Sequence, residues 1–533
     1  MLGGVHRKSG FYLEVRALDF KMYNNKERIQ KELDSFKLGF CGKLDPENRW
    51  ILLSGLIPWE LLEPLYQHQF NNRGRPAKRF RVALGSLIIQ ETLGVSDREL
   101  VIQISENPYM QFFLGFPSFE TKIPFDSSLL VYFRKRINWK NIAQINDLIA
   151  AQCPNDEVPE TNSGTIDKND DDPENGQAIE ETCLPHNEPV EGTLILDATC
   201  IPADIRYPQD LSLLDEARRK TETIIDVLHK SVGGKKPRTY RIAARKQFLA
   251  VIRKRKKEPK QMQKAIGKQL QYVGRNLRAI KDLMDNYRQQ QGQGSLLSVL
   301  SNAEYKALLV VHELYRQQLE LKGKKKRSIP DRIVSIRQPH IRPIIRGKAR
   351  SDVEFGAKVS VACFNGFIFV DRISFDAYSE SKDIPLQVEA YRLRTGHYPE
   401  RILADKAYQN RENRQWCKER GIRLMGVKQG RSFEDPYISK LFRKLERIEE
   451  IERVEIEGRI GIQKRRYNWN TVKGRLPETA MTMIMLAVLA ANLTKRMSDI
   501  LFYLFQAMFT NCITLKKLLP CLPVTENCAC NLI

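Results

Sequence analysis

Apolar residues recur at helical spacing through the first 150 residues of the chain. One such pattern runs from Val82 to Gln90 and follows the basic stretch Gly74–Arg81. A second begins at Ser96, a residue type that caps helices, with Glu99 three positions further on. A third ends in the basic run Phe133–Arg136. Short helices with basic entries are typical of DNA-binding modules, and equally of other small helical bundles.

From Gly192 the pattern changes to short apolar strands separated by turns and helices. The first strand pattern is Gly192–Cys200, and two later ones, Glu354–Val361 and Phe367–Ile373, flank Asn365-Gly366, a strong hairpin signal. The elements expected after the hairpin are a helix at Ile384–Thr395, a strand at Arg401–Tyr408, a helix at Arg411–Arg420 and a strand at Ile422–Met425. This alternation predicts an α/β fold.

Three segments depart from this pattern. Residues 154 to 192 are rich in Asp, Glu, Asn and Pro and have little to bury, which predicts a disordered linker or a long surface loop. The segment from about Leu211 to Arg337 is polar, mostly helical in pattern, and carries several runs of cations. Those cations fit either contact with a phosphate backbone or a solvated helical insertion. The longest apolar run, Ala480 to Leu493, is shorter than the ~20 residues of a membrane span, which predicts a buried helix.

The charge balance points to a polyanionic partner. The 533 residues include 87 Lys and Arg against 64 Asp and Glu, a formal net charge of +23. A surplus of this size favours nucleic acid most often and a membrane surface less often, and a soluble basic protein is the alternative. The 10 cysteines include no CxxC pair, and no signal peptide precedes them, so reduced thiols in a cytosolic protein are expected.

The stretch from Glu449 to Tyr467 carries the most informative spacing. Read as a helix, it places Arg453, Glu457 and Lys464 on one face. A carboxylate flanked by cations suits a metal site that also holds phosphate, and an ordinary ion pair on a solvated helix explains the same spacing. Two glycines in this helix, at positions 458 and 461, each cost about 1 kcal/mol and favour a packing or ligand reason.

Two aspartates stand where apolar strands give out. Asp197 follows the first strand run, and Asp405 follows Ile402-Leu403-Ala404. Strand ends are where α/β folds place functional groups, although a strand-ending turn residue is the common alternative. Asp204 competes with Asp197, but it follows a proline and lies outside the strand. Together with Glu457, the two aspartates form an all-oxygen set of the kind that suits Mg²⁺ or Mn²⁺.

These features resemble the bacterial insertion-sequence DDE transposases, which have an RNase H-like core. The resemblance covers roughly residues 70 to 150 and 193 to 495. It rests on several motifs in the family's order: Gly74-Arg75-Pro76, Gly94–Leu100, Phe113–Phe116, Phe133–Arg136, Leu196–Thr199, Arg346–Ala349, Val353–Lys358, Ala404–Tyr408, Ile456–Gly461 and Lys464–Tyr467. The Tyr-Arg-Glu-Lys signature of related transposases is met at Arg453, Glu457 and Lys464, but Glu450 stands where tyrosine is expected. The first helices are similar to a helical N-terminal domain of the InsH type.

The resemblance implies a fold and a division of the chain. The fold class is α/β, with an RNase H-like mixed sheet flanked by helices, a helical N-terminal DNA-binding domain and a basic helical insertion. The insertion lies between the first acid and the next strands, whereas better-known relatives have theirs between the second and third acids. The implied parts are the N-terminal domain at 1–150, an acidic linker at 151–192, the core at 193–210 and 338–495, the insertion at 211–337 and a tail at 496–533.

The resemblance also implies an activity and its residues. Asp197, Asp405 and Glu457 would be the catalytic acids and would bind Mg²⁺ or Mn²⁺, two ions in each site. DNA contacts would come from basic residues in both regions: Arg75, Lys78, Arg79, Arg134, Lys135, Arg136, Lys406, Arg453, Arg459, Lys464, Arg465 and Arg466. The enzyme would cut DNA at the terminal inverted repeats of its element and join the ends to a target, acting as a homodimer or larger complex in the bacterial cytoplasm, at the nucleoid and not at a membrane. The alternatives are a metal-dependent nuclease without strand transfer and an inactive, transposase-derived DNA-binding protein.

Overall fold

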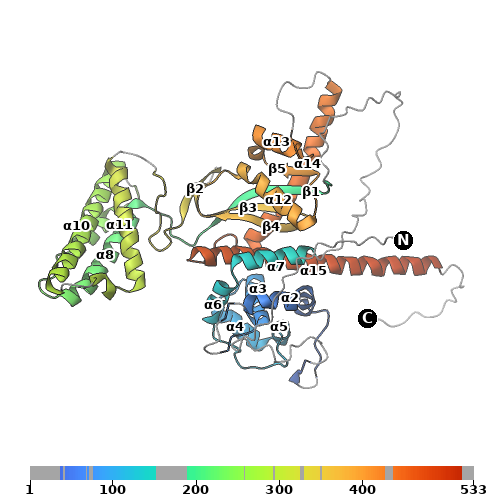
Figure 1. Ribbon diagram of the computed structural model, residues 1–533, viewed down its shortest axis with the longest axis horizontal. Helices are drawn as coiled ribbons and strands as arrows, with labels where there is room; N and C mark the ends of the chain where they lie inside the picture. The colour runs from blue at the N-terminus through green and yellow to red at the C-terminus, as the bar shows by residue number, and fades with distance from the viewer. Residues whose placement is uncertain are drawn as a thin grey trace, which may run out of the picture. The chain divides into compact units, whose positions relative to one another are not determined.

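The computed structural model describes most of the chain and divides it into two compact units (Figure 1). The described residues are 36–39, 42–67, 69–70, 76–151, 189–256, 258–291, 295–323, 329–348, 351–426 and 436–518. The N-terminal unit comprises Met1–Ala178, Phe364–Phe369 and Met485–Ile533. The sheet unit comprises Ile179–Cys363 and Val370–Ile484. This division cuts the hairpin that was predicted to lie within the core, and it also cuts a long helix that spans the predicted core and the predicted tail.

The N-terminal unit is helical around one buried helix. Its helices in the first part of the chain are α1 (Arg49–Leu56), α2 (Trp59–Gln67), α3 (Phe80–Leu93), α4 (Asp97–Glu106), α5 (Pro108–Phe113), α6 (Leu129–Arg136) and α7 (Trp139–Ala151). Residues Phe80 to Glu91 of α3 are all buried, which is the pattern of a core helix. The cap predicted at Ser96 is confirmed, because its side chain accepts a hydrogen bond from the Glu99 N–H.

Two asparagines join distant segments inside the N-terminal unit. Asn492 lies in α15 (Pro477–Leu518), where it interrupts the apolar run, and it is buried. Its Nδ2 donates to Asn146 Oδ1 at 2.8 Å and to the Ile368 carbonyl at 2.7 Å, while its Oδ1 accepts from the Ile368 N–H at 3.0 Å. Buried polar groups need such partners, so this cluster fixes α7, α15 and the hairpin tip together.

Helix α15 also bears on the tail and the membrane predictions. It extends to Leu518, so most of the predicted tail is helical. Among the described residues, one helical span, Pro477–Tyr503, is long and apolar enough to cross a membrane. The residues from Ile484 to Ala490 are buried in the protein, as expected for the core helix that the sequence predicts.

The sheet unit contains a mixed sheet with β1 near its centre. Its strands are β1 (Thr193–Pro202), β2 (Arg342–Lys348), β3 (Ser351–Phe364), β4 (Phe367–Ser374), β5 (Arg401–Ala404) and β6 (Arg423–Leu424). The order is β2-β3-β1-β5-β6, with β4 paired to β3. Strand β1 is antiparallel to β3 and parallel to β5, and β5 is parallel to β6. This arrangement agrees with the α/β class predicted, and positive φ angles at Asn365 and Gly366 confirm the predicted hairpin turn.

Helices connect and cover these strands. Helix α12 (Ile384–Thr395) leads to β5, α13 (Arg411–Lys418) connects β5 to β6, and α14 (Pro436–Arg466) follows β6. Helix α14 contacts both β1 and β5. It therefore lies beside the two strands that carry the predicted aspartates.

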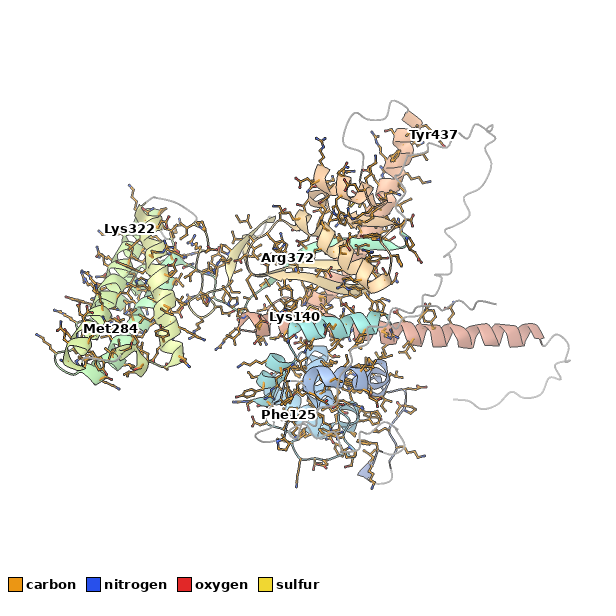
Figure 2. The ribbon with its side chains drawn as sticks, viewed as in Figure 1. Phe125, Lys140, Met284, Lys322, Arg372 and Tyr437 are labelled. Carbon is orange, nitrogen blue, oxygen red and sulfur yellow. The ribbon has the colours of Figure 1, made fainter. Side chains whose placement is uncertain are left out.

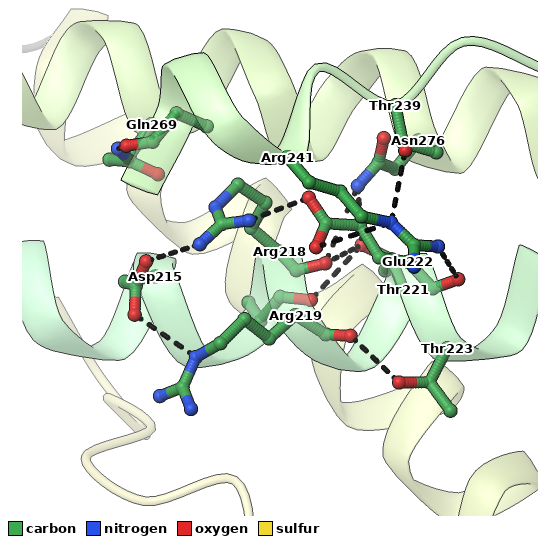
Figure 3. A network of polar contacts seen from close by, with 12 residues as sticks. Asp215, Arg218, Arg219, Thr221, Glu222, Thr223, Thr239, Arg241, Gln269 and Asn276 are labelled. Carbon is green, nitrogen blue, oxygen red and sulfur yellow. Dashed lines mark hydrogen bonds and ion pairs between the residues drawn. The ribbon is translucent and has the colours of Figure 1, made fainter. Parts of the chain in front are cut away.

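The segment between β1 and β2 forms a helical bundle. It contains α8 (Asp210–Val232), α9 (Arg241–Ile252), α10 (Pro259–Gln291) and α11 (Asn302–Gly323), and α8 packs along α10 and α11. Two apolar clusters fill it, with Met284 at the edge of one (Figure 2). On α8 the buried Arg218 guanidinium lies between Asp215 and Glu222, with 2.6 Å to each (Figure 3). The described part is thus a packed helical bundle with its own apolar core.

Candidate active site

Asp197 and Asp405 occupy equivalent positions on neighbouring parallel strands. Leu196 of β1 pairs with Ala404, the last residue of β5, and each aspartate is the next residue along the chain. Adjacent strands lie about 4.8 Å apart, and Asp405 keeps an extended backbone, so the two side chains leave the sheet on the same face. Strand β5 ends at Ala404 while β1 continues, which leaves Asp197 half-buried and Asp405 exposed at this step. The structure therefore brings these two predicted acids together.

Local hydrogen bonds orient both carboxylates. The Ala198 N–H donates to Asp197 Oδ1 at 2.7 Å, and the Lys406 N–H donates to Asp405 Oδ1 at 2.6 Å. Within the described chain, no cation lies within 4 Å of the Asp405 carboxylate. Asp405 consequently keeps an oxygen available for a ligand in solution.

Helix α14 is fixed to the sheet by ion pairs near its middle and by a hydrogen bond after its last residue. Glu452 pairs with Arg401, the first residue of β5, at 2.9 Å, and the buried Glu449 pairs with Arg423 of β6. After the helix, the Val472 N–H donates to the Pro202 carbonyl at the far end of β1, at 2.9 Å. The helix thus runs from the start of β5 toward the end of β1.

Glu457 lies between these two anchor points. Its neighbour Ile456 is buried, as are Ile460 and Gln463 one and two turns on, so this stripe of α14 is packed. The Glu457 side chain is 51% exposed and its Oε1 lies 2.9 Å from Arg453 Nη2. Among the described residues, no three acidic, histidine or cysteine side chains form a group that could hold a metal ion. Glu457 is therefore beside the strands of the two aspartates, with its carboxylate turned toward Arg453.

The two glycines of α14 differ in their surroundings. A Cβ at position 461 would lie 3.4 Å from Arg465 Nη2. A Cβ at position 458 would meet nothing within 4 Å. The 3.4 Å distance at position 461 is an ordinary contact with the flexible end of an exposed side chain, so nothing in the structure explains either glycine.

The remaining cations of this region gather at the end of α14 and after β5. Arg465 and Arg466 are exposed in the last turn, Lys464 is half-buried, and Lys406 is exposed beside Asp405. Arg459 lies 3.5 Å from Glu455 on the same helix. Basic side chains near a helix C-terminus also complement its dipole, so their position alone does not require DNA.

The basic residues predicted for DNA contact in the N-terminal unit have different roles. Lys78 donates to the Pro124 carbonyl at 3.0 Å, and the Arg136 guanidinium lies over the Phe70 ring. Arg79 is half-buried before α3, Lys135 is exposed, and Arg75 lies outside the described residues. Arg134 needs a correction, because its guanidinium is buried between Asp97 and Gln90. It joins α3, α4 and α6, and we assign it no contact with DNA.

Replacing Arg134 with alanine should lower the free energy of unfolding of the N-terminal unit by about 2–3 kcal/mol. This loss of stability is smaller than the loss expected for a fully buried ion pair, because the Asp97 side chain is 34% exposed. Burial alone would raise the pKa of Asp97, but hydrogen bonds from Arg134 and Gln90 hold it below its ordinary value. The pair therefore stabilises above the unfolded-state pKa near 4, and this contribution is lost as the pH falls through the lower folded value.

Urea unfolding followed at pH 7 and pH 3 measures this effect. The control is Lys135→Ala, which removes an exposed cation from the neighbouring position and should change stability by less than about 0.5 kcal/mol. Equal stabilities for the two variants at pH 7 would show that the buried pair contributes nothing.

A polar cluster on β3 and the segment after β4 was not predicted from the sequence. Ser360 donates to the buried Asp383 at 2.5 Å, and Asp383 also pairs at 2.7 Å with Arg372 of β4. Figure 2 labels Arg372 on the sheet unit. Lys358 pairs with Glu380 at 2.6 Å. The hydroxyl of Tyr408, which follows Asp405 by three residues, is buried, and burial together with Glu380 and Asp197 raises its pKa. Polar residues within the apolar run of β3 were the signal that could have shown this cluster.

Comparison with known proteins assigns two segments of the chain. Residues 41–136 match the family described as "Transposase domain (DUF772)", and residues 402–494 match the family described as "Transposase DDE domain". Both are transposase domains. The second match includes Asp405 and Glu457, whereas Asp197 lies before it.

The two domain matches together support the assignment of this chain as an insertion-sequence DDE transposase. The chain is also similar to "Uncharacterized protein ORF8 in nfe locus" of Rhizobium meliloti, with 32% identity over 112 residues. Those residues make up 21% of this chain and 54% of the relative, so the match spans about half the length of that protein. No solved structure matches the chain.

Proposed function

We propose that this protein is a DNA transposase that cuts DNA at the terminal inverted repeats of its own element and joins the ends to a target. The observation that carries the proposal is the register of β1 and β5, which sets Asp197 and Asp405 side by side at one step of the sheet. The matched transposase domains support the same activity. Acids so placed serve phosphoryl transfer better than a purely DNA-binding role, since carboxylates repel phosphate.

The sheet supports an RNase H-like core for this activity. A central first strand has an antiparallel hairpin on one side and shorter parallel strands on the other, and a long helix follows the last strand. The pairing of β1 with β5 brings Asp197 and Asp405, which are far apart in the sequence, to one step of the sheet.

The donor set fits Mg²⁺ or Mn²⁺. Its side chains are carboxylates, which hard divalent cations prefer, and the Asp405 carboxylate lacks a cationic partner among the described residues. Asp197 and Asp405 would hold the metal, and Glu457 would join them after its carboxylate leaves Arg453. When bound, a pair of such ions activates an attacking hydroxyl and stabilises the leaving 3′ oxygen.

The neighbouring cations would hold the DNA. Arg453 is already beside Glu457, so its guanidinium becomes available to a phosphate when that carboxylate turns away. Lys406, Arg459, Lys464, Arg465 and Arg466 would contact the backbone on either side. In the N-terminal unit, the candidates for DNA contact are Lys78, Arg79, Lys135 and Arg136. Arg75 is a further candidate from the sequence, since it lies outside the described residues. A homodimer or a larger complex would hold the two ends of the element.

Cleavage of DNA from the flanks of the gene, with and without Mg²⁺, tests the proposal. We expect the full-length protein to cut one end of its element only with metal and to produce joined DNA when a target plasmid is added. Cleavage without joined products would identify a nuclease instead. Binding without any cleavage would identify an inactive DNA-binding derivative.

A further inference from the structure

A basic pocket lies where the helical bundle meets the sheet. Its volume is about 690 Å³, and it is lined by the segment after β1, the first turns of α8, the segment before β2 and Arg475. All of these residues belong to the sheet unit. The pocket is separate from the step that carries Asp197 and Asp405.

Cations outnumber acids around this pocket. Five basic side chains line it, against two acids, Asp204 and Glu216. The basic residues are Arg206, Arg219, Lys220, Arg337 and Arg475. Arg219 pairs with Asp215 at 3.1 Å and Arg337 with Glu216 at 3.9 Å. Arg206, Lys220 and Arg475 have no carboxylate within 4 Å among the described residues, so their charge is available to an anion.

Polar groups of the pocket also lack partners. Gln338 is 4% exposed, and its Oε1 has no hydrogen-bond partner among the described residues, nor does the buried Ser212 Oγ. Buried groups without partners are costly, which favours a ligand or water that completes them.

An exposed aromatic ring stands at the same place. Tyr207 is 67% exposed and is held by an edge-to-face contact with Phe355, with ring centroids 5.6 Å apart. Exposed aromatic rings beside cations are the surfaces on which unpaired bases stack. The pocket therefore combines phosphate-binding and base-binding groups.

The position of the pocket relates it to the candidate active site. Strand β1 runs on from Asp197 to Pro202, about 17 Å at about 3.3 Å per residue, and the first residue that lines the pocket, Asp204, follows two positions later. B-form DNA rises about 3.4 Å per base pair, so this span equals about five base pairs. One DNA end can reach both places.

We infer that this pocket binds the DNA substrate about five base pairs from the cleaved phosphate, with backbone phosphates on Arg206, Lys220 and Arg475 and an unpaired base on Tyr207. The inference rests on the proposed function for the identity of the DNA. It gives the bundle inserted after β1 a role in holding the substrate.

Salt-dependent binding of the full-length protein tests the phosphate contacts. The probe is a 40-base-pair duplex from the flank of the gene, blunt or with a three-nucleotide overhang, measured without metal. The variant is Arg206→Gln with Arg475→Gln. The matched control is Lys230→Gln with Lys306→Gln, which removes two exposed cations of the bundle outside the pocket.

Each phosphate contact contributes about 0.9 to the magnitude of the slope of log affinity against log salt concentration. The pocket variant, which lacks two arginines, should therefore have a slope smaller by about 1.8, and the slope of the control should change much less. Tyr207→Ala should weaken binding of the overhang DNA about tenfold and leave the blunt duplex nearly unchanged. A pocket variant with the slope of the control, or a wild-type protein that binds neither DNA, overturns the inference. If the slope falls as expected and the wild type never cuts, the pocket binds DNA and the proposed transposase activity alone fails.

Discussion

Asparagine in place of Asp405 should reduce metal-dependent DNA cleavage by about 10³-fold or more while DNA binding persists. Loss of a metal ligand removes several kcal/mol of transition-state stabilisation, and each 1.36 kcal/mol corresponds to tenfold in rate. Because Asp405 is exposed and its described contact is a bond from the next N–H, the substitution leaves the sheet intact. Single-turnover cleavage and binding of the same DNA measure the two effects separately.

Glu457→Gln should show the same loss, and α14 provides a matched control. Glu455 is two residues away, exposed, and paired with an arginine four residues on, as Arg453 and Glu457 are paired four apart. Glu455→Gln removes a comparable charge and ion pair and should leave cleavage within about twofold, since such exposed pairs contribute only a few tenths of a kcal/mol. If the two variants cut at the same rate, Glu457 is an ordinary ion-pair partner and not a ligand.

The sequence predicted the strands themselves better than it predicted where they end. Asp197, expected at the end of its strand, lies in the middle of β1 (Thr193–Pro202), and the strand expected at Arg401–Tyr408 stops at Ala404. Asp197 and Asp405 were found because a short apolar run and a following acid are local features, and strand pairing placed them together. The sequence could not show that β5 stops one residue before Asp405 while β1 continues for several more. That difference, set by pairing with β3, is what leaves the two acids unequally exposed.

Cations were predicted less well, because sequence shows charge but not burial. Arg134 and Lys135 are adjacent and chemically similar, yet Arg134 is buried against Asp97 and Lys135 is exposed. The pocket cations Arg206 and Arg475 are far apart in the sequence and stand in no cation run, so only the fold brings them together. The cluster of Lys358 and Asp383 was not predicted for the same reason, since its residues come from β3, β4 and the segment that follows β4.

Alanine in place of Gly356 should destabilise the sheet unit by about 3 kcal/mol or more and abolish cleavage with it. Gly356 of β3 pairs with Pro202 of β1, and a Cβ there would lie 2.0 Å from the Ile201 carbonyl oxygen, a backbone atom that cannot turn aside. The two strands would have to separate along the same ladder that holds Asp197 opposite Val361. Gly458→Ala is the control, because its Cβ meets open space and a helix interior favours alanine by up to about 1 kcal/mol. Urea unfolding of both variants should therefore give shifts of opposite sign, and a Gly356→Ala protein as stable as wild type would mean that β3 does not pass this close to β1.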